Sequence, residues 1–522
     1  MRILFVNPPL KGWRYSRSQR SPGVIRSGTL YYPYWLAYAA GWAEQSGHDI
    51  DLIDCPADGL TVDDIVARAR THGAGLIVFE TTTGSFSADL ETVSAVKLAL
   101  PDSRTALVGT HATADWQNAL QRCPALDFVA IGEYDVTVAD LASRLEAGQP
   151  PEEVLGLGLR SDGVLHRTLD RPLIHDMDAL PWASKIYKRF LKTPNYLFTI
   201  ASHPMVMIIS GRGCRARCFY CVYPQVMHGH TYRTRSPADV VAEMKWIQEN
   251  MPEVKEIVFE DDTFTFDRER AREIAGLVRE QGVRLPWFAN IRVNVDRDTL
   301  AALRQAGLRQ CAAGFESGSD LLLRNMRKGQ TLQQQQQFMK TCRELGILVH
   351  GCFMVGFPGE TAETLDQTLK LAMQLEPDSA QFYPVMPYPG TGAYAWAKEN
   401  GHLATDNFDD WLNENGEHRC VIDLPTLSAA DLEAFCEQAT RSFHLRPRYI
   451  ARKLAQAVTR PREGIRSIGA GRNFLAKLLR GRQQPAPARL PARHAAAEMP
   501  DAWLQPQRVP RGRMETVGDA GR

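Results

Sequence analysis

The stretch Gly211-Arg-Gly-Cys-Arg-Ala-Arg-Cys-Phe-Tyr-Cys221 holds the only close group of cysteines in this 522-residue sequence. Cys214, Cys218 and Cys221 fall within eight residues with the spacing C-x3-C-x2-C. An apolar run at residues 205–209 predicts a short buried strand that leads into this loop. A ferredoxin-type four-iron cluster uses four thiolates, whereas the next cysteine here is Cys311. A cluster on this loop would therefore keep one iron open for another ligand.

The residues alone allow two other interpretations of the three cysteines. A zinc ion could bind the three thiolates together with His228 or His230 as the fourth ligand. The cysteines could also be unligated side chains of the core. Because a motif gains meaning from its structural context, the rest of the chain has to decide between these alternatives.

The cysteine spacing, with the aromatic Tyr220 directly before the last cysteine, resembles the radical S-adenosylmethionine (SAM) superfamily. This resemblance implies a [4Fe–4S] cluster on Cys214, Cys218 and Cys221 whose open iron chelates the amino and carboxylate groups of SAM. It also implies cleavage of SAM to a 5′-deoxyadenosyl radical, with the electron supplied by a donor such as flavodoxin or ferredoxin.

Residues 201–400 alternate strand-like and helical patterns in six units. The apolar runs predict strands at residues 205–209, 256–259, 287–291, 310–315, 350–355 and 381–385. Six units are fewer than the eight of a closed (β/α) barrel, and a six-unit partial barrel is the fold that the radical SAM resemblance implies. Active-site residues are then expected on the loops that follow the strands.

Those loops carry the predicted SAM contacts. The resemblance places Asp261 and Asp262 at the amino end of SAM, although acidic residues replace the usual Gly-Gly-Glu of the family. Glu316 is expected to accept hydrogen bonds from the ribose, and Arg327 to pair with the SAM carboxylate. The complete predicted set on this side is Tyr220, Asp261, Asp262, Asn290, Glu316, Arg327, Gly356 and Phe357, of which the last two are expected to pack against adenine.

Residues 1–150 predict a second α/β domain, a doubly wound parallel sheet. Strand-like runs at residues 2–6, 49–53, 76–80, 106–109 and 128–131 alternate with helical patterns. Ligands bind such sheets at the carboxyl ends of the strands, and small polar residues follow these strands here. No G-x-G-x-x-G follows the first strand, which argues against a dinucleotide.

A sheet domain of this kind before a radical SAM loop resembles the cobalamin-binding domain of B12-dependent radical SAM proteins. The resemblance implies cobalamin held by Thr83, Ser85, Gly109, Gly132 and Glu133. In many cobalamin proteins a histidine of D-x-H-x-x-G ligates cobalt, but Pro9 stands at that position here, which implies base-off cobalamin without an imidazole ligand. The alternative is a degenerate sheet that only packs against its neighbour.

Further motifs narrow the resemblance. Residues 224–236, 261–264 and 355–360 resemble the group that includes the anaerobic magnesium-protoporphyrin ester cyclases, and Tyr32-Pro-Tyr-Trp-Leu36 is similar to hopanoid-biosynthesis radical SAM proteins. This implies a small-molecule or lipid substrate, with rearrangement or cyclisation on a hopanoid-type side chain. Methyl transfer from methylcobalamin to carbon is the alternative reaction. A non-catalytic cobalamin- or zinc-binding sensor is the alternative from another class.

The remaining segments are predicted to be peripheral. Residues 151–200 predict a linker with a small hairpin, residues 401–480 a helical basic region, and residues 481–522 a disordered tail. Residues 441–493 contain fourteen Arg or Lys and one acidic residue, Glu463. Apolar residues interleave with these charges, which favours amphipathic helices on an anionic membrane surface. A basic helix that closes the barrel or touches nucleic acid non-specifically is the alternative.

The composition limits the partners and the compartment. A net charge of +1 implies no global electrostatic partner and no specific nucleic acid. The sequence shows no signal-peptide h-region and no apolar run long enough to span a bilayer. Dispersed cysteines fit a reducing compartment, so we expect a cytoplasmic protein with peripheral contact at the inner membrane.

Overall fold

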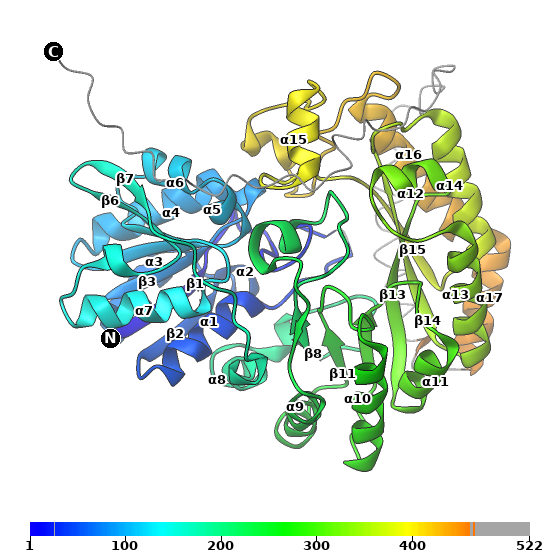
Figure 1. Ribbon diagram of the computed structural model, residues 1–522, viewed down its shortest axis with the longest axis horizontal. Coiled ribbons are helices and arrows are strands. Elements are labelled where there is room, and N and C mark those ends of the chain that lie inside the picture. Colours follow the sequence, from blue (N-terminus) through cyan, green and yellow to red (C-terminus); the bar gives the residue numbers. More distant parts are fainter. Residues whose placement is uncertain (26, 460–462, 465–522) are drawn as a thin grey trace.

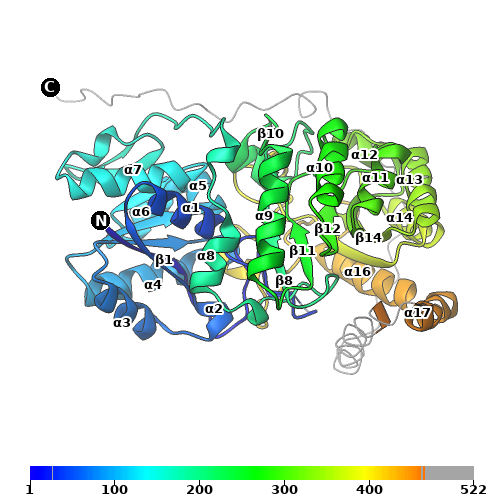
Figure 2. The same ribbon diagram turned by 90° about the horizontal axis from the view of Figure 1, so that it is seen from below.

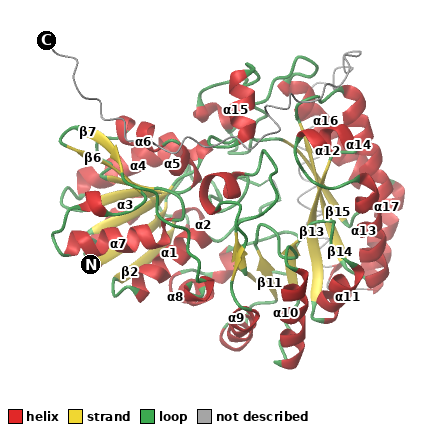
Figure 3. Ribbon diagram, in the orientation of Figure 1, coloured by secondary structure: helices red, strands yellow, loops and turns green. Residues whose placement is uncertain are grey.

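The computed structural model describes residues 1–25, 27–459 and 463–464. Two largely parallel sheets lie next to each other, the first in blue and cyan and the second in green in Figure 1. Helices cover the faces of the first sheet and the outside of the second (Figure 3). Both predicted α/β units are therefore present, and the fold class predicted from the sequence is confirmed.

The first sheet begins with five parallel strands in the order β2-β1-β3-β4-β5. Helices cover both of its faces, so the apolar strand residues point alternately into two cores, Ile3 and Phe5 into one and Leu4 and Val6 into the other. The strands are β1 (Arg2–Asn7), β2 (Asp49–Asp54), β3 (Leu76–Glu80), β4 (Arg104–Val108) and β5 (Phe128–Ala130). The main covering helices are α1 (Tyr34–Gln45), α3 (Val62–His72), α4 (Phe86–Ala99), α6 (Trp116–Arg122) and α7 (Tyr134–Glu146).

The predicted small hairpin extends this first sheet. Strand β6 (Leu157–Ser161) pairs antiparallel with β5, and β7 (Val164–Arg167) pairs antiparallel with β6. Asp162 and Gly163 both have positive φ, at 50° and 80°, as a two-residue hairpin turn of this kind requires. Helix α8 (Ala183–Phe190) then leads to the second sheet.

The second sheet has six parallel strands in the order β15-β14-β13-β12-β11-β8, the predicted six-unit partial barrel. Its strands are β8 (Met205–Ile208), β11 (Glu256–Phe259), β12 (Trp287–Asn290), β13 (Leu308–Glu316), β14 (Leu348–Val355) and β15 (Ser379–Pro384). The intervening helices are α9 (Pro237–Asn250), α10 (Arg268–Glu280), α11 (Arg297–Gln305), α12 (Asp320–Asn325), α13 (Leu332–Leu345) and α14 (Ala362–Leu375).

The prediction of a helical region from residue 401 onward is wrong for residues 401–428. After α15 (Gly392–Glu399) the chain forms only the short 3-10 helix η6 (Phe408–Trp411) and isolated bridges such as Leu403 to Ile422. Turn-forming residues, among them Gly401 and Gly416 with positive φ, interrupt any helical pattern here. The helices α16 (Ala429–His444) and α17 (Pro447–Thr459) follow. Residues 465–480 of the predicted helical region and the predicted tail at residues 481–522 lie outside the described residues.

Candidate active site

The cysteine loop is held in place by its own backbone. It begins in a two-stranded ribbon of β9 (Gly211–Arg212) and β10 (Arg233–Thr234). Gly213 has a φ of +85°, and a Cβ there would lie 2.2 Å from the carbonyl oxygen of Thr231, so only glycine fits. The amide of Gln225 donates to the carbonyl oxygens of Cys218, Phe219 and Cys221. The three cysteines are thus presented on a loop whose carbonyl groups are already bonded.

The three thiols of this loop fit an iron–sulfur cluster, and the two histidines named as possible zinc ligands are hydrogen-bonded through Nδ1. Cys214, Cys218 and Cys221 are free thiols. His228 Nδ1 lies 3.0 Å from Glu133 Oε1, and His230 Nδ1 lies 3.0 Å from the carbonyl oxygen of Cys214. Among the described residues, no group of three or more His, Cys, Asp or Glu side chains could hold a metal ion. A [4Fe–4S] cluster binds each cysteine through a different iron, so the three thiols of this loop could serve one cluster and leave one iron open.

Burial keeps the thiols of Cys214 and Cys221 protonated when no metal is bound. Burial and the neighbouring carboxylate of Asp262 raise the pKa of Cys214 and of Cys221 above the ordinary value. Ligation requires thiolates, so binding of a cluster must displace these protons.

The predicted ribose contact, Glu316, sits in a buried polar cluster. Tyr220 donates from its hydroxyl to Glu316 Oε1 at 3.1 Å, and Lys328 Nζ donates to the same oxygen. Glu316 has a φ of +64°, and a Cβ on Gly314 would lie 2.1 Å from Glu316 Oε1. The second oxygen, Oε2, is buried without a hydrogen-bond partner. An open, buried acceptor at a strand end fits a ligand with hydroxyl groups, as the SAM prediction requires.

Lys328 was missed by the sequence analysis, which singled out Arg327 beside it. Burial opposes the charge of Lys328, but the carboxylate of Glu316 holds the pKa of this lysine above its ordinary value. Arg327 has a φ of +54°, and burial together with the charge of Arg217 lowers its pKa. The cation that contacts Glu316 is therefore Lys328.

The other predicted SAM residues fall into two groups. Phe357 and Gly356 lie near Tyr220, whereas the polar side chains bond to the protein backbone. Phe357 is buried with its ring centroid 5.4 Å from that of Tyr220, and Gly356 before it has a φ of +92°. Asp262 accepts a hydrogen bond from the backbone N–H of Gly213 at 3.2 Å. Asp261 instead accepts from the backbone N–H of Ser210 at 2.6 Å, and Asn290 donates to the carbonyl oxygen of Asp261 at 3.3 Å.

Ion pairs clamp the cysteine loop to the first sheet. Arg212 makes a bidentate pair with Asp135, at 2.7 and 2.9 Å, and both side chains are buried. Arg233 pairs with Glu133, whose pKa is held below its usual value by His228 and Arg233 in spite of burial. Both acids follow β5, so the carboxyl edge of the first sheet faces the cysteine loop.

A third ion pair joins the segment after β1 to the second sheet. Arg20 Nη1 donates to Glu260 Oε2 at 2.9 Å, and Arg20 also lies 3.6 Å from Asp262. Sequence reasoning missed all three arginines, Arg20, Arg212 and Arg233, because nothing local in the sequence indicates partners about 80 to 240 residues away.

The residues predicted to hold cobalamin gather at the carboxyl ends of β3, β4 and β5. Thr83 Oγ1 lies 3.2 Å from His111 Nδ1, and His111 Nε2 is buried without a hydrogen-bond partner, 3.9 Å from Asp115. Ser85 donates to Asp89 at 2.6 Å. A Cβ on Gly109 would lie 2.4 Å from the carbonyl oxygen of Thr81, whereas one on Gly132 would meet open space. An unpartnered buried nitrogen and an open glycine turn fit a polar ligand at this edge.

Arg17 fixes the loop in which Pro9 stands at the position of the cobalt-ligating histidine. Arg17 donates from Nη1 to the side chain of Asn7 and to the carbonyl oxygen of Pro8, at 2.7 Å each. The same guanidinium pairs with the buried Asp89 at 2.6 Å. These contacts fix the conformation of the loop that follows β1.

Replacing Glu80 with glutamine should remove a pH dependence of stability. Burial raises the pKa of Glu80 to about 7, although Ser18 donates to both of its oxygens. The folded chain thus binds a proton between about pH 4.5 and 7 that the unfolded chain does not, so stability falls as pH rises through this window. We expect Glu80→Gln to gain on the order of 1–3 kcal/mol over the unchanged protein at about pH 8, and little at about pH 5.

Urea denaturation of the cofactor-free protein at the two pH values measures this difference. Glu91→Gln, on an exposed position of α4, serves as the control. An equal gain for both variants at both pH values would show that Glu80 does not titrate in this range.

Comparison with known proteins agrees with this geometry. The radical SAM superfamily model matches residues 208–372, and the B12 binding domain model matches residues 20–142. The chain belongs to the B12-binding radical SAM proteins and is a cobalamin-dependent radical SAM enzyme. The uncharacterized methyltransferase PH0819 of Pyrococcus horikoshii is 30% identical, over 87% of this chain and 95% of its own.

Other relatives and solved structures match most of the chain. An anaerobic magnesium-protoporphyrin IX monomethyl ester cyclase of Cereibacter sphaeroides is 26% identical, over 75% of this chain and 63% of its own. The radical SAM methyltransferase TsrM of Kitasatospora setae, solved with cobalamin and a [4Fe-4S] cluster, shares the fold with a TM-score of 0.66 at 16% identity, over 91% of this chain and 99% of its own. The cobalamin-dependent radical enzyme OxsB gives a TM-score of 0.67 at 14% identity, over 92% and 72%.

Proposed function

We propose that this enzyme transfers a methyl group to an unactivated carbon of a small-molecule substrate. The observation that carries this proposal is the two ion pairs between the domains, Arg212 with Asp135 and Arg233 with Glu133. These pairs hold the cysteine loop against the strand ends of the B12-binding domain, so both cofactors would face one substrate. The match to a methyltransferase over nearly its full length supports the same reaction.

On the SAM side, each residue would have a separate role in binding a cofactor. When bound, the [4Fe–4S] cluster with SAM supplies a radical that removes hydrogen from carbon, and cobalamin supplies the methyl group. Cys214, Cys218 and Cys221 would hold the cluster. Glu316, oriented by Tyr220 and Lys328, would hold the ribose of SAM, and Phe357 would pack on its adenine.

On the cobalamin side, Thr83, Ser85, Gly109 and Gly132 would line the nucleotide tail. Glu133, which pairs with His228 and Arg233, would fix the cysteine-loop ribbon beside cobalamin. The substrate would lie between the two domains, and a flavodoxin or ferredoxin would supply the electron.

A rearrangement or cyclisation is the second candidate, supported by the likeness to the magnesium-protoporphyrin ester cyclase. The segment that singles out the hopanoid resemblance is Tyr32-Pro-Tyr-Trp-Leu36. Tyr32 stacks on Tyr196 with ring centroids 3.8 Å apart, and Tyr32 and Leu36 are fully buried. This segment therefore forms the buried start of α1 and does not indicate the substrate.

Tracing the methyl group separates the two candidates. The enzyme would be reconstituted anaerobically with cobalamin and given SAM deuterated at its methyl group, together with the metabolites that accumulate in a strain lacking the gene. Methyl transfer predicts a deuterated product with S-adenosylhomocysteine and 5′-deoxyadenosine. An unlabelled product with 5′-deoxyadenosine alone would establish rearrangement, and no SAM-derived product at all would favour a non-catalytic sensor.

A further inference from the structure

Helix α17 displays a row of exposed apolar side chains. Among the described residues, four of the seven exposed large apolar side chains lie between Leu445 and Val458. Ile450 is 44% exposed, Leu454 65% and Val458 81%. Their spacing of four residues places the three on one side of the helix. Exposed apolar side chains gathered in this way mark an interaction surface.

The opposite side of α17 fixes the helix to the barrel. Tyr449 donates from its hydroxyl to the carbonyl oxygen of Asp378 at 3.1 Å. Arg452 donates to the carbonyl oxygens of Glu376 and Pro377 at 2.7 and 2.6 Å. At 100° per residue, Tyr449 and Arg452 lie nearly opposite Leu454. The helix is thus held by one face at the edge of the molecule, where Figure 2 shows it. The exposed fractions of Ile450, Leu454 and Val458 place the apolar row toward solvent.

The surroundings of this row are positively charged. Residues 441–459 contain no Asp or Glu and five basic residues, Arg441, Arg446, Arg448, Arg452 and Lys453. At 100° per residue, Arg448 and Lys453 flank the apolar row, whereas Arg452 is turned toward the barrel. The side chain of Arg448 is 83% exposed although it pairs with Glu376. Within the part of the chain that the structure describes, no helix is long and apolar enough to cross a membrane.

We propose that α17 docks the enzyme on an anionic lipid surface, with Ile450, Leu454 and Val458 inserted among the acyl chains at the interface. A helix with an apolar face and a basic border lies in the plane of such a surface. Each basic residue near anionic lipid adds attraction that salt screens. This inference rests on α17 alone and does not depend on the reaction proposed above.

Vesicle co-sedimentation of the full-length protein tests the proposal without any assay of activity. The vesicles would contain equal parts of phosphatidylcholine and phosphatidylglycerol, with pure phosphatidylcholine as the comparison. The test variant is Leu454→Glu with Val458→Glu. Leu98→Glu is the matched control, because Leu98 is 86% exposed on the B12-binding domain.

The unchanged protein and the Leu98→Glu variant should both sediment with the anionic vesicles at low salt. Both should dissociate from the vesicles at high salt. The α17 variant should bind at least about tenfold more weakly, because two carboxylates would have to enter the interface. Failure of the unchanged protein to sediment, or equal binding by the α17 variant, would overturn the proposal. Concentration-dependent dimerisation without vesicle binding would also overturn it, since a second copy would then be the partner.

Discussion

Replacing Cys218 with alanine is expected to abolish both cluster binding and SAM cleavage. Cys218 is one of three thiols that would each bind a different corner of the cluster, and it is buried in the loop. Loss of even an outer partner of a metal ligand costs about 10–100-fold, so loss of a direct ligand should reduce SAM cleavage by more than about a hundredfold. Iron and sulfide content after anaerobic reconstitution, and the yield of 5′-deoxyadenosine, measure the two effects.

The control for this experiment is Cys123→Ala. Cys123 is also a buried free thiol, but it lies in the B12-binding domain, where its sulfur contacts Ser94 and Leu90. This variant should keep its iron and its activity. Wild-type iron content in Cys218→Ala, or equal iron loss in both variants, would count against the assignment of the three-cysteine loop.

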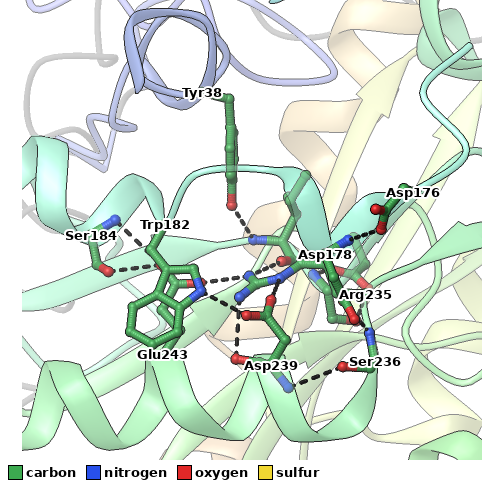
Figure 4. A network of polar contacts seen from close by, with 12 residues as sticks. Tyr38, Asp176, Asp178, Trp182, Ser184, Arg235, Ser236, Asp239 and Glu243 are labelled. Carbon is green, nitrogen blue, oxygen red and sulfur yellow. Dashed lines mark hydrogen bonds and ion pairs between the residues drawn. The ribbon is translucent and has the colours of Figure 1, made fainter. Parts of the chain in front are cut away.

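Replacing Arg235 with methionine should cause the largest loss of stability among single changes outside the cofactor sites. Figure 4 shows Arg235 between Asp239 and Glu243 of α9. Its side chain is fully buried, with Nε 2.7 Å from Asp239 and Nη1 2.9 Å from the carbonyl oxygen of Ile209. Removing the guanidinium leaves the buried carboxylate of Glu243 without its cation, which costs about 3–5 kcal/mol.

This network also connects the two domains. Ser184 of α8 donates to Glu243, and Trp182 donates to Asp239 at 2.9 Å. Tyr38 of α1 accepts a hydrogen bond from the backbone N–H of Ile209 at 3.1 Å. We therefore expect Arg235→Met to lower the urea midpoint of the whole protein.

Two comparison variants make this stability prediction specific. Arg297→Met removes an ion pair with Glu344 whose side chains are 56% and 45% exposed, and it should cost no more than about 1 kcal/mol. Arg235→Met combined with Glu243→Leu should recover part of the loss, because the uncompensated buried charge is gone. Equal destabilisation by the buried and the exposed arginine would show that the network contributes little.

Much of the fold could be predicted from the sequence because both sheets are covered by helices. Strands buried on both faces appear as apolar runs, so β11 and β3 have the bounds expected for them and the other strands differ by a few residues. The region after residue 400 was predicted less well. Its buried residues include Trp411, beside η1 (Thr83–Ser85), and Val421, Ile422 and Leu427. Because these residues lie on irregular backbone or in the short 3-10 helix η6, their burial leaves no periodic signal in the sequence.

The site was predictable only where a short motif carries the chemistry. Cys214, Cys218 and Cys221 are recognisable from spacing alone, and Glu316 follows from its place at a strand end. Lys328 was missed because its partner becomes evident only when Glu316 adopts positive φ beside Gly314. Glu133 was predicted as a cofactor contact, whereas both of its oxygens are engaged by His228 and Arg233.

Electron paramagnetic resonance of the anaerobically reconstituted protein tests the central claim most directly. The reduced protein would be measured before and after addition of SAM. A cluster bound by three cysteines should give a [4Fe–4S]⁺ signal whose g-values shift when SAM binds the open iron. A signal that saturating SAM leaves unchanged, or a protein that holds zinc in place of iron, would contradict the claim.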